Sequence, residues 1–462
     1  MNVKAYHVAD AAGVRIDAVE EGERLREEAQ GAILGKSITL SIEGLKDFFF
    51  ADWHPELVDL MIIAAAVEYC DLSVRRPAWG WARAFDLRVA VHEDALWDRP
   101  AVRQALEEAL AFLTGDRWEL SFIRRRNDVV KVGPRKLDLS TPDKIIMPYS
   151  DGLDSRAVAA IVGAEEQGGL VRVRLGTRGA DTKGTPRKQR RFTAVPFEVK
   201  LGKHQRVESS ARSRGFKFAI ITGIAAQLAE VDRIVVTESG QGALGPIIAS
   251  SGQIYPDYRV HPAFTQRIEK LFAAMGKSVP TYEYPRIWYT KGETLAAAQA
   301  LEAAPSWHDT RSCWQDSRRV SFDGRRRQCG ICAACMLRRM SMHTAGIVEA
   351  SDEYIWEDLG ASDIRGGTVK GFARMSKAFE DYAIAGILHL DHLAALARSD
   401  LHRRAVRRVA HETADGLGIE AAVAERELFD LLERHRSEWL AFLASLGKES
   451  FVSRIAMVSP WQ

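Results

Sequence analysis

The chain has 462 residues, of which 46% are hydrophobic and 27% charged, and its formal net charge is +2. This size suits two or three soluble domains, and the near-balanced charge excludes a protein that binds nucleic acid over its whole surface. No apolar run reaches the roughly 20 residues that span a bilayer. The first 23 residues lack the basic-then-apolar form of a secretory signal, so we expect a cytoplasmic protein with no membrane partner.

The N-terminal part, residues 1–138, predicts an α+β accessory domain without a catalytic motif. Its alternating and amphipathic stretches predict a strand at 38–43, a helix at 54–70, a strand at 83–91, a helix at 98–115 and a strand at 117–126. Asp98-Arg99-Pro100 and Gly115 are typical start and stop signals for the second helix. Cys70 lies inside an apolar pattern, which favours a small buried side chain.

Residues 139–310 predict an α/β domain, a parallel sheet with helices on both faces, because short apolar strands alternate with helical patterns. The strands are expected at 144–149, 170–175, 195–199 and 233–237, and the helices at 155–167, 215–231 and 262–276. A basic segment at 178–192 interrupts the alternation and predicts a loop.

Residues 365–462 predict a helical domain, since apolar residues recur there at three- and four-residue spacing. The helical patterns cover 373–389, 390–418 and 419–447. Histidines on such patterns are usually structural, and we interpret five of them in this way: His308, His389, His392, His402 and His411.

One loop breaks the pattern in a way that predicts chemistry. Residues 150–155 read Ser-Asp-Gly-Leu-Asp-Ser between an apolar strand and a helix. The first backbone N–H groups of a helix have no partner within it, and the helix dipole attracts anions to them. Gly152 permits close approach of a ligand, and the two serines add hydroxyl donors. A capped helix start, with Ser150 or Asp151 as the cap, is the alternative.

The loop resembles the S-G-G-x-D-S motif of the PP-loop ATP pyrophosphatases, which have the adenine nucleotide α-hydrolase-like fold. Asp151 stands where that family has glycine, and its extra carboxylate requires Mg²⁺ or a basic side chain nearby. The resemblance implies that ATP is cleaved between its α- and β-phosphates and that an acyl oxygen is adenylated. The residues that would hold ATP and Mg²⁺ are Ser150, Asp151, Gly152, Leu153, Asp154 and Ser155.

Four cysteines define a segment at residues 311–346. Cys313, Cys329, Cys332 and Cys335 have the spacing C-x15-C-x2-C-x2-C. Four thiolates satisfy a tetrahedral Zn²⁺, and the surrounding basic residues favour thiolates. An iron–sulfur cluster also takes four cysteines, but the spacing lacks the C-P ending of the ferredoxin motif. We predict zinc.

The loop and the cysteines together resemble the 7-cyano-7-deazaguanine synthases, the QueC family. That family carries Ser-Cys followed by Cys-Gly-x-Cys-x-x-Cys-x-x-Arg, which here is Ser312-Cys313 and Cys329 to Arg338. Three further motifs are similar in order: Arg214 with Phe218, Tyr255 to Arg259 with Tyr258 replacing a cysteine, and Lys291 with Glu293. The resemblance implies Asp154, Ser155, Arg214 and Lys291 as catalytic residues, and Tyr255, Asp257 and Arg259 as the binding site for a deazapurine.

The implied reaction is adenylation of the carboxylate of 7-carboxy-7-deazaguanine and attack by an amine, either ammonia or an amine of a partner protein. Enlarged members of this family occur in bacterial anti-phage cassettes, of the Qat type and of one cyclic-oligonucleotide (CBASS) type, and this chain resembles them. The partner protein would then come from the same cassette. Two alternatives stay open: a tRNA-thiolating PP-loop enzyme that binds RNA through residues 183–191, and a non-catalytic nucleotide-binding scaffold.

Overall fold

The computed structural model of the protein describes most of the chain. Described are residues 13–40, 54–77, 82–126, 145–150, 152–166, 169–174, 192–193, 197–202, 204–209, 211–249, 256–308, 310–315 and 317–461. Asp151, Tyr255 and the basic run 183–191 lie outside these ranges, so what we expect of them stays a prediction.

The chain forms two compact units, each assembled from separate segments. Unit 1 comprises residues 1–146, 172–234 and 264–281, and unit 2 comprises residues 147–171, 235–263 and 282–462. The division into domains at 1–138, 139–310, 311–346 and 365–462 stays a prediction.

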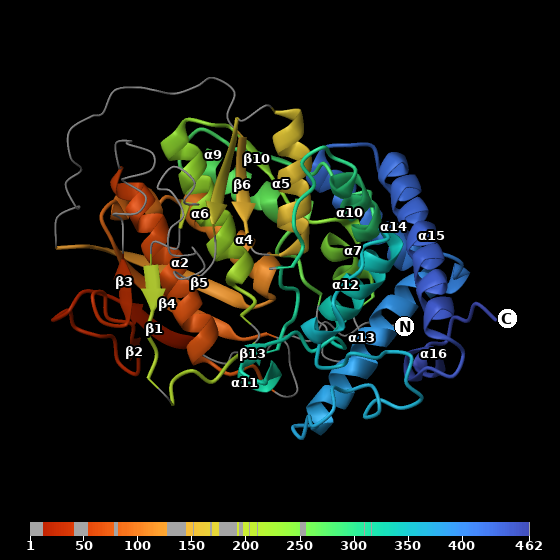
Figure 1. The fold of residues 1–462 in the computed structure, drawn as a ribbon. Coiled ribbons are helices and arrows are strands. Elements are labelled where there is room, and N and C mark those ends of the chain that lie inside the picture. Colours follow the sequence, from red (N-terminus) through yellow and green to blue (C-terminus); the bar gives the residue numbers. More distant parts are fainter. Residues whose placement is uncertain are drawn as a thin grey trace. The chain divides into compact units, whose positions relative to one another are not determined.

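Unit 1 contains a four-stranded sheet in the order β2-β1-β4-β5, shown in Figure 1, and each neighbouring pair is parallel. The strands are β1 (Val14–Ala18), β2 (Gln30–Gly31), β4 (Ala84–Val91) and β5 (Arg117–Arg124). Between β1 and β4 the chain passes through β2, β3 (Ile38–Leu40) and helix α2 (Pro55–Ser73), while α3 (Asp94–Trp97) and α4 (Pro100–Thr114) connect β4 to β5. The α+β prediction was therefore wrong, since a parallel sheet that packs with helices is an α/β arrangement.

The two long helices of this region differ in how well the sequence predicted them. Helix α4 begins with Pro100 and ends at Gly115, whose φ of 70° is left-handed, as the start and stop signals indicated. Helix α2 was predicted to be amphipathic, but residues 57–67 are buried without a break. The helix contacts β4 and also α6 (Arg214–Ala229), so it has no wholly exposed face to leave polar.

One strand pairs differently from the prediction. Residues 195–199 were expected in the sheet of the 139–310 region. Instead β9 (Phe197–Val199) pairs antiparallel with β3 (Ile38–Leu40), more than 150 residues earlier in the chain. An apolar run indicates a strand, but it does not specify which strand becomes its neighbour.

A five-stranded sheet has the order β11-β10-β6-β7-β8, with β6 parallel to β10 and β7 parallel to β8. Its strands are β6 (Ile145–Tyr149), β7 (Leu170–Arg174), β8 (Phe192–Thr193), β10 (Arg233–Val235) and β11 (Thr281–Glu283). Read from β8, the chain order is 3-2-1-4-5, so the winding direction reverses between β6 and β10. In open α/β sheets, ligands bind at the carboxyl ends of the strands at such a switch point.

The C-terminal helical prediction is confirmed, and Figure 1 shows these helices in blue. They are α13 (Lys377–Leu396), α14 (Arg403–Leu417), α15 (Ala421–Leu446) and α16 (Phe451–Ile455).

The remaining helices are α5 (Leu153–Glu165), α7 (Gly240–Ala243), α8 (Gly245–Ile248), α9 (Pro262–Ala274), α10 (Lys291–Gln299), α11 (Ser317–Val320) and α12 (Ala333–Thr344). Strands β12 (Ser321–Phe322) and β13 (Arg325–Arg326) form a hairpin. No helix within the described ranges has the length and apolar character of a membrane span.

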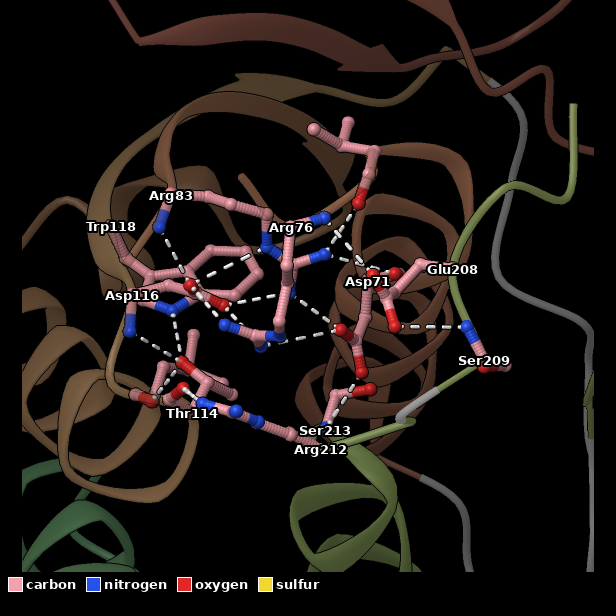
Figure 2. Close-up of polar contacts among 12 residues, drawn as sticks. Asp71, Arg76, Arg83, Thr114, Asp116, Trp118, Glu208, Ser209, Arg212 and Ser213 are labelled. Atoms are coloured by element: carbon pink, nitrogen blue, oxygen red, sulfur yellow. Dashed lines mark hydrogen bonds and ion pairs between the residues drawn. The ribbon is translucent and has the colours of Figure 1, made fainter. Parts of the chain in front are cut away.

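A buried cluster of arginine and aspartate side chains lies in unit 1 (Figure 2). Arg83 donates to Asp71 at 2.6 Å and to Asp116 at 2.7 Å, and Arg76 donates to Asp116 at 2.8 Å. Asp71 and Asp116 have fully buried side chains. Asp71 also accepts from the N–H of Ser213 at 2.8 Å, directly before α6, so the cluster connects the end of α2, the edge of the sheet and the start of α6.

We expect Asp116→Ala to lower the free energy of unfolding by about 3–5 kcal/mol, because it leaves two arginines with one buried carboxylate fewer. Urea denaturation followed by circular dichroism measures the change. Glu119→Ala on the exposed side of β5 is the matched control, with an expected change within about 0.5 kcal/mol. Equal effects of the two substitutions would contradict the structural role of the cluster.

His389 on α13 makes stability depend on pH. Its Nδ1 donates to the Ala249 carbonyl at 2.6 Å, and burial lowers the pKa of this histidine to about 4. Between that value and the unfolded pKa of about 6.5, the unfolded chain binds a proton that the folded chain does not. Stability should therefore fall as the pH drops from about 6.5 to 4. His389→Gln should make this fall smaller by up to about 3 kcal/mol. The measurement is the free energy of unfolding by urea, for variant and wild type, at pH 7 and at pH 4.5. An equal loss of stability in the two proteins between these pH values would contradict the prediction.

Candidate functional site

The loop after β6 forms a compact turn of hydroxyl groups at the start of α5. Ser150 Oγ lies 3.0 Å from Ser155 Oγ, and it accepts from the N–H of Gly152 at 3.2 Å. Ser155 Oγ lies 3.2 Å from Thr237 Oγ1, which follows β10. Gly152 is the N-cap of α5 and provides no capping side chain. The first turn of α5 and these hydroxyls can therefore receive an anion at the switch point.

Lys291 extends from the first position of α10 to this loop. Its Nζ lies 2.5 Å from Asp154 Oδ2 and 3.8 Å from Glu238 Oε1. The other oxygen of Asp154 accepts from Ser239 Oγ at 2.8 Å. Lys291 is 7% exposed and Asp154 is 9% exposed, so the pair is nearly buried. Two predicted residues that are 137 positions apart are thus brought into direct contact.

The charges at this point are unevenly balanced, with two carboxylates around one ammonium. Burial and the Asp154 carboxylate raise the pKa of Glu238. Although burial alone would lower it, the two carboxylates raise the pKa of Lys291, so the amine stays charged. Carboxylate oxygens are the protein ligands that Mg²⁺ prefers, and Asp154 and Glu238 are the residues here that could hold this ion.

Thr237, Glu238 and Ser239 were not among the predicted site residues. They follow β10 after Val236, and β10 is the strand that neighbours β6 across the switch point. Their position after an apolar strand was the available signal, but which strand lies beside β6 cannot be read from the local pattern. The structure therefore adds one carboxylate and two hydroxyls to the predicted set.

The start of α10 has a capping box that holds Lys291 in place. Thr290 Oγ1 accepts from the N–H of Glu293 at 3.0 Å, and Glu293 Oε2 accepts from the N–H of Thr290 at 2.7 Å. This reciprocal pair satisfies two backbone donors at the helix start. The Lys-x-Glu motif that suggested the family resemblance is thus also a helix-capping signal.

The remaining predicted residues lie in two places. Asp257 Oδ2 accepts from Arg259 Nε at 2.5 Å, so these two predicted substrate residues form an ion pair. Both also act electrostatically on Glu238, which connects them to the site. Arg214 begins α6 in unit 1, and its guanidinium lies over the ring of Phe218 at 4.9 Å. The predicted role of Arg214 stays a prediction.

The four cysteines converge as predicted. Their sulfur atoms all lie within 4.8 Å of one another, and the Cys329 and Cys335 sulfurs are 3.8 Å apart. Tetrahedral ligands at the Zn–S length of about 2.3 Å are about 3.8 Å apart, so the group fits a single zinc ion. A [4Fe–4S] cluster would bind each thiolate to a different iron and spread the sulfurs farther.

Backbone donors surround the sulfurs. Cys313 Sγ accepts from the N–H of Cys329 at 3.2 Å and of Gln315 at 3.4 Å, and Cys329 Sγ accepts from the N–H of Cys332 at 3.3 Å. Such hydrogen bonds stabilise thiolates and orient metal ligands. Burial raises the pKa of Cys329 and Cys335, so several adjacent thiolates here require a cation.

A separate cavity of about 340 Å³ lies elsewhere in unit 2, at the far end of α10. Trp307, His308, Arg338 and Glu349 are among the residues that line it, and the described loop residues, 150 and 152–155, are not among them. The Arg338 guanidinium is paired with Glu349 at 2.6 Å and with Thr310 Oγ1 at 2.8 Å. The cavity is therefore separate from the described part of the loop at 150–155, and its arginine is already paired.

Comparison with known families gives a match over part of the chain. Residues 218–346 match the family model described as "Queuosine biosynthesis protein QueC". Comparisons with curated proteins and with solved structures gave no match. The matched range contains Asp257, Arg259, Lys291 and all four cysteines, while the loop at 150–155 precedes it. This match supports the QueC-like resemblance over residues 218–346.

Proposed function

We propose that the protein is an ATP-dependent C–N ligase that adenylates the carboxylate of 7-carboxy-7-deazaguanine and transfers the acyl group to an amine. The observation that carries the proposal is the contact between Lys291, inside the QueC-like range, and Asp154 of the loop that resembles a PP-loop. An enzyme of this class needs a cation beside the leaving pyrophosphate and a cradle of donors around it.

The chemistry balances in two steps. A carboxylate oxygen of the substrate attacks the α-phosphorus of ATP, the bond to the bridging oxygen breaks, and pyrophosphate leaves with the electron pair. The amine nitrogen then attacks the acyl carbon, AMP leaves, and the amine loses one proton. Ammonia would give the primary amide, and a protein amine would give a conjugate.

The residues of the site have distinct roles in this scheme. Ser150, Ser155 and the first turn of α5 bind the pyrophosphate oxygens, and Lys291 neutralises their charge. Mg²⁺ bound at Asp154 and Glu238 would offset the added phosphate charge. Asp257, held by Arg259, accepts hydrogen bonds from the N–H groups of the guanine-like edge.

Anti-phage defence is part of the proposal because the chain extends well beyond the QueC-like range on both sides, as in the enlarged family members. The partner would be a protein of the same cassette that presents the amine. After incubation of that protein with enzyme, acid and MgATP, its intact mass should rise by the acyl group. An unchanged mass would restrict the amine to ammonia or another small molecule.

The deciding experiment mixes purified protein, MgATP and 7-carboxy-7-deazaguanine with ammonium, and measures AMP and pyrophosphate with and without the acid. Acid-dependent AMP is the expected result. ATP binding without AMP formation would favour the scaffold alternative. Iron with labile sulfide in the protein would favour the thiolating alternative, and neither result is compatible with the ligase as proposed.

A further inference from the structure

Helix α15 reaches the candidate site through buried side chains, although it lies outside the QueC-like range. Gln241 on α7 is the connecting residue. Its Oε1 accepts from the N–H of Lys291 at 2.7 Å, and its Nε2 lies 2.8 Å from His435 Nδ1 and 3.2 Å from Glu438 Oε2. His435 is 1% exposed and Gln241 is 3% exposed, so water does not compete for these bonds.

The hydrogen-bond directions in this network follow from one carbonyl. His435 Nε2 lies 2.8 Å from the carbonyl oxygen of Leu390, which can only accept, so Nε2 carries the hydrogen. In the neutral ring Nδ1 is then an acceptor, and Gln241 must present its NH₂ group to it. This orientation in turn points the amide oxygen of Gln241 at the N–H of Lys291.

Glu438 of α15 also contacts the start of α10, through Thr290 and Gln241. Its Oε1 accepts from the hydroxyl of Thr290, the residue that caps α10, and Oε2 accepts from Gln241. The neighbouring Arg434 pairs with Glu293 at 3.0 Å, so α15 contacts both members of the capping box. The N–H of Lys291 is one of the first-turn donors that have no partner inside a helix, and Gln241 supplies that partner.

The backbone of α7 packs closely against α15 at Gly240. A Cβ atom on Gly240 would lie 2.5 Å from Leu431 Cδ2 of α15 and closer still to the carbonyl oxygen of Ile287. Only glycine fits at this position. This close approach places the backbone beside Gln241 directly against α15.

We propose that His435 and Glu438 of α15 are positioning residues for Lys291, acting through Gln241 and Thr290. The C-terminal helical region is then an integral part of the active site and not a separate module. This inference rests on the proposed function only for its activity measurement, because the proposed function has Lys291 neutralise the leaving pyrophosphate.

The test compares two substitutions at one position. His435→Leu removes both hydrogen bonds, whereas His435→Gln can accept from Gln241 and donate to Leu390. Amide hydrogen exchange at residues 290–296, normalised to α12, should become at least ~10-fold faster in His435→Leu and stay near wild type in His435→Gln. Glu438→Leu should act like His435→Leu, because it removes the acceptors of both Gln241 and the Thr290 hydroxyl.

Leu432→Ala is the control for general loss of packing, since Leu432 is a buried residue of the same helix outside the network. In the enzyme assay kcat should fall up to about 10²-fold in His435→Leu, because Lys291 would be displaced from the leaving pyrophosphate, with a smaller change in the KM for ATP. Identical exchange at 290–296 in His435→Leu and Leu432→Ala would overturn the inference. If the wild type forms no AMP, the proposed function fails, and the exchange measurement still decides this inference.

Discussion

Replacing Lys291 with methionine is expected to lower kcat for acid-dependent AMP formation at least ~10²-fold. Methionine has nearly the same length and no charge, so it removes the only ammonium within 4 Å of Asp154 and Glu238 among the described residues. Negative charge that develops on the leaving pyrophosphate would then face Asp154 and Glu238 without this ammonium. The measurement is steady-state AMP production at saturating ATP, with the KM for ATP determined in parallel.

Two variants separate this effect from misfolding. Lys270→Met changes an exposed lysine whose Nζ contacts Gln266 within the same helix, and it should leave kcat unchanged. Lys291→Arg keeps the charge and should retain more activity than Lys291→Met, though not full activity, because the guanidinium has a different shape. Metal content at the cysteine site reports whether unit 2 is still folded. A folded Lys291→Met protein with kcat within threefold of wild type would exclude the assigned role.

The sequence predicted those elements whose determinants are local. Pro100 and Gly115 are local start and stop signals of helix α4, and the predicted ends of this helix lie within two residues of the observed ends. Strand β9 was found as a strand but assigned to the wrong sheet, because its partner β3 is far away in the chain. The parallel order β2-β1-β4-β5 also depends on which strands become neighbours. The local residue pattern of a strand does not specify its neighbours.

The same distinction holds in the candidate site. Asp154 and Lys291 were predicted from short motifs, and their contact supports the view that both motifs serve one site. Glu238 was not predicted, because its proximity to Asp154 depends on β10 lying beside β6. His435 was missed for a similar reason, since a histidine on an amphipathic helix is usually structural. His435 differs from the other helical histidines in its buried hydrogen bond to Gln241, whose amide oxygen accepts from the N–H of Lys291.

The cysteine site leads to the other large effect. The purified protein should contain one zinc ion per chain, and Cys335→Ser should reduce this to less than ~0.1 and lower the midpoint of thermal unfolding by at least ~10 °C. Cys329, Cys332 and Cys335 belong to one buried cluster with Trp356 and Trp439, so they join the QueC-like range to the C-terminal helices. Loss of the ion would leave buried thiols at sulfur-to-sulfur contact and loosen this cluster. Metal analysis and differential scanning calorimetry measure the two quantities.

Cys70→Ala is the matched control, because Cys70 is also fully buried but lies in α2 of unit 1 and is not one of the four clustered cysteines. It should keep the full metal content and cost about 1 kcal/mol, as expected for trimming a small buried side chain. A Cys335→Ser protein that retains stoichiometric zinc would refute the four-cysteine site. Iron with labile sulfide in the wild type would instead require the sulfurs to surround a cluster, which their separation of 3.8 Å between Cys329 and Cys335 opposes. If zinc occupies this site, none of the four thiolates can act as a sulfur carrier for the proposed ATP site. A zinc-bound protein would therefore favour amide formation over thiolation.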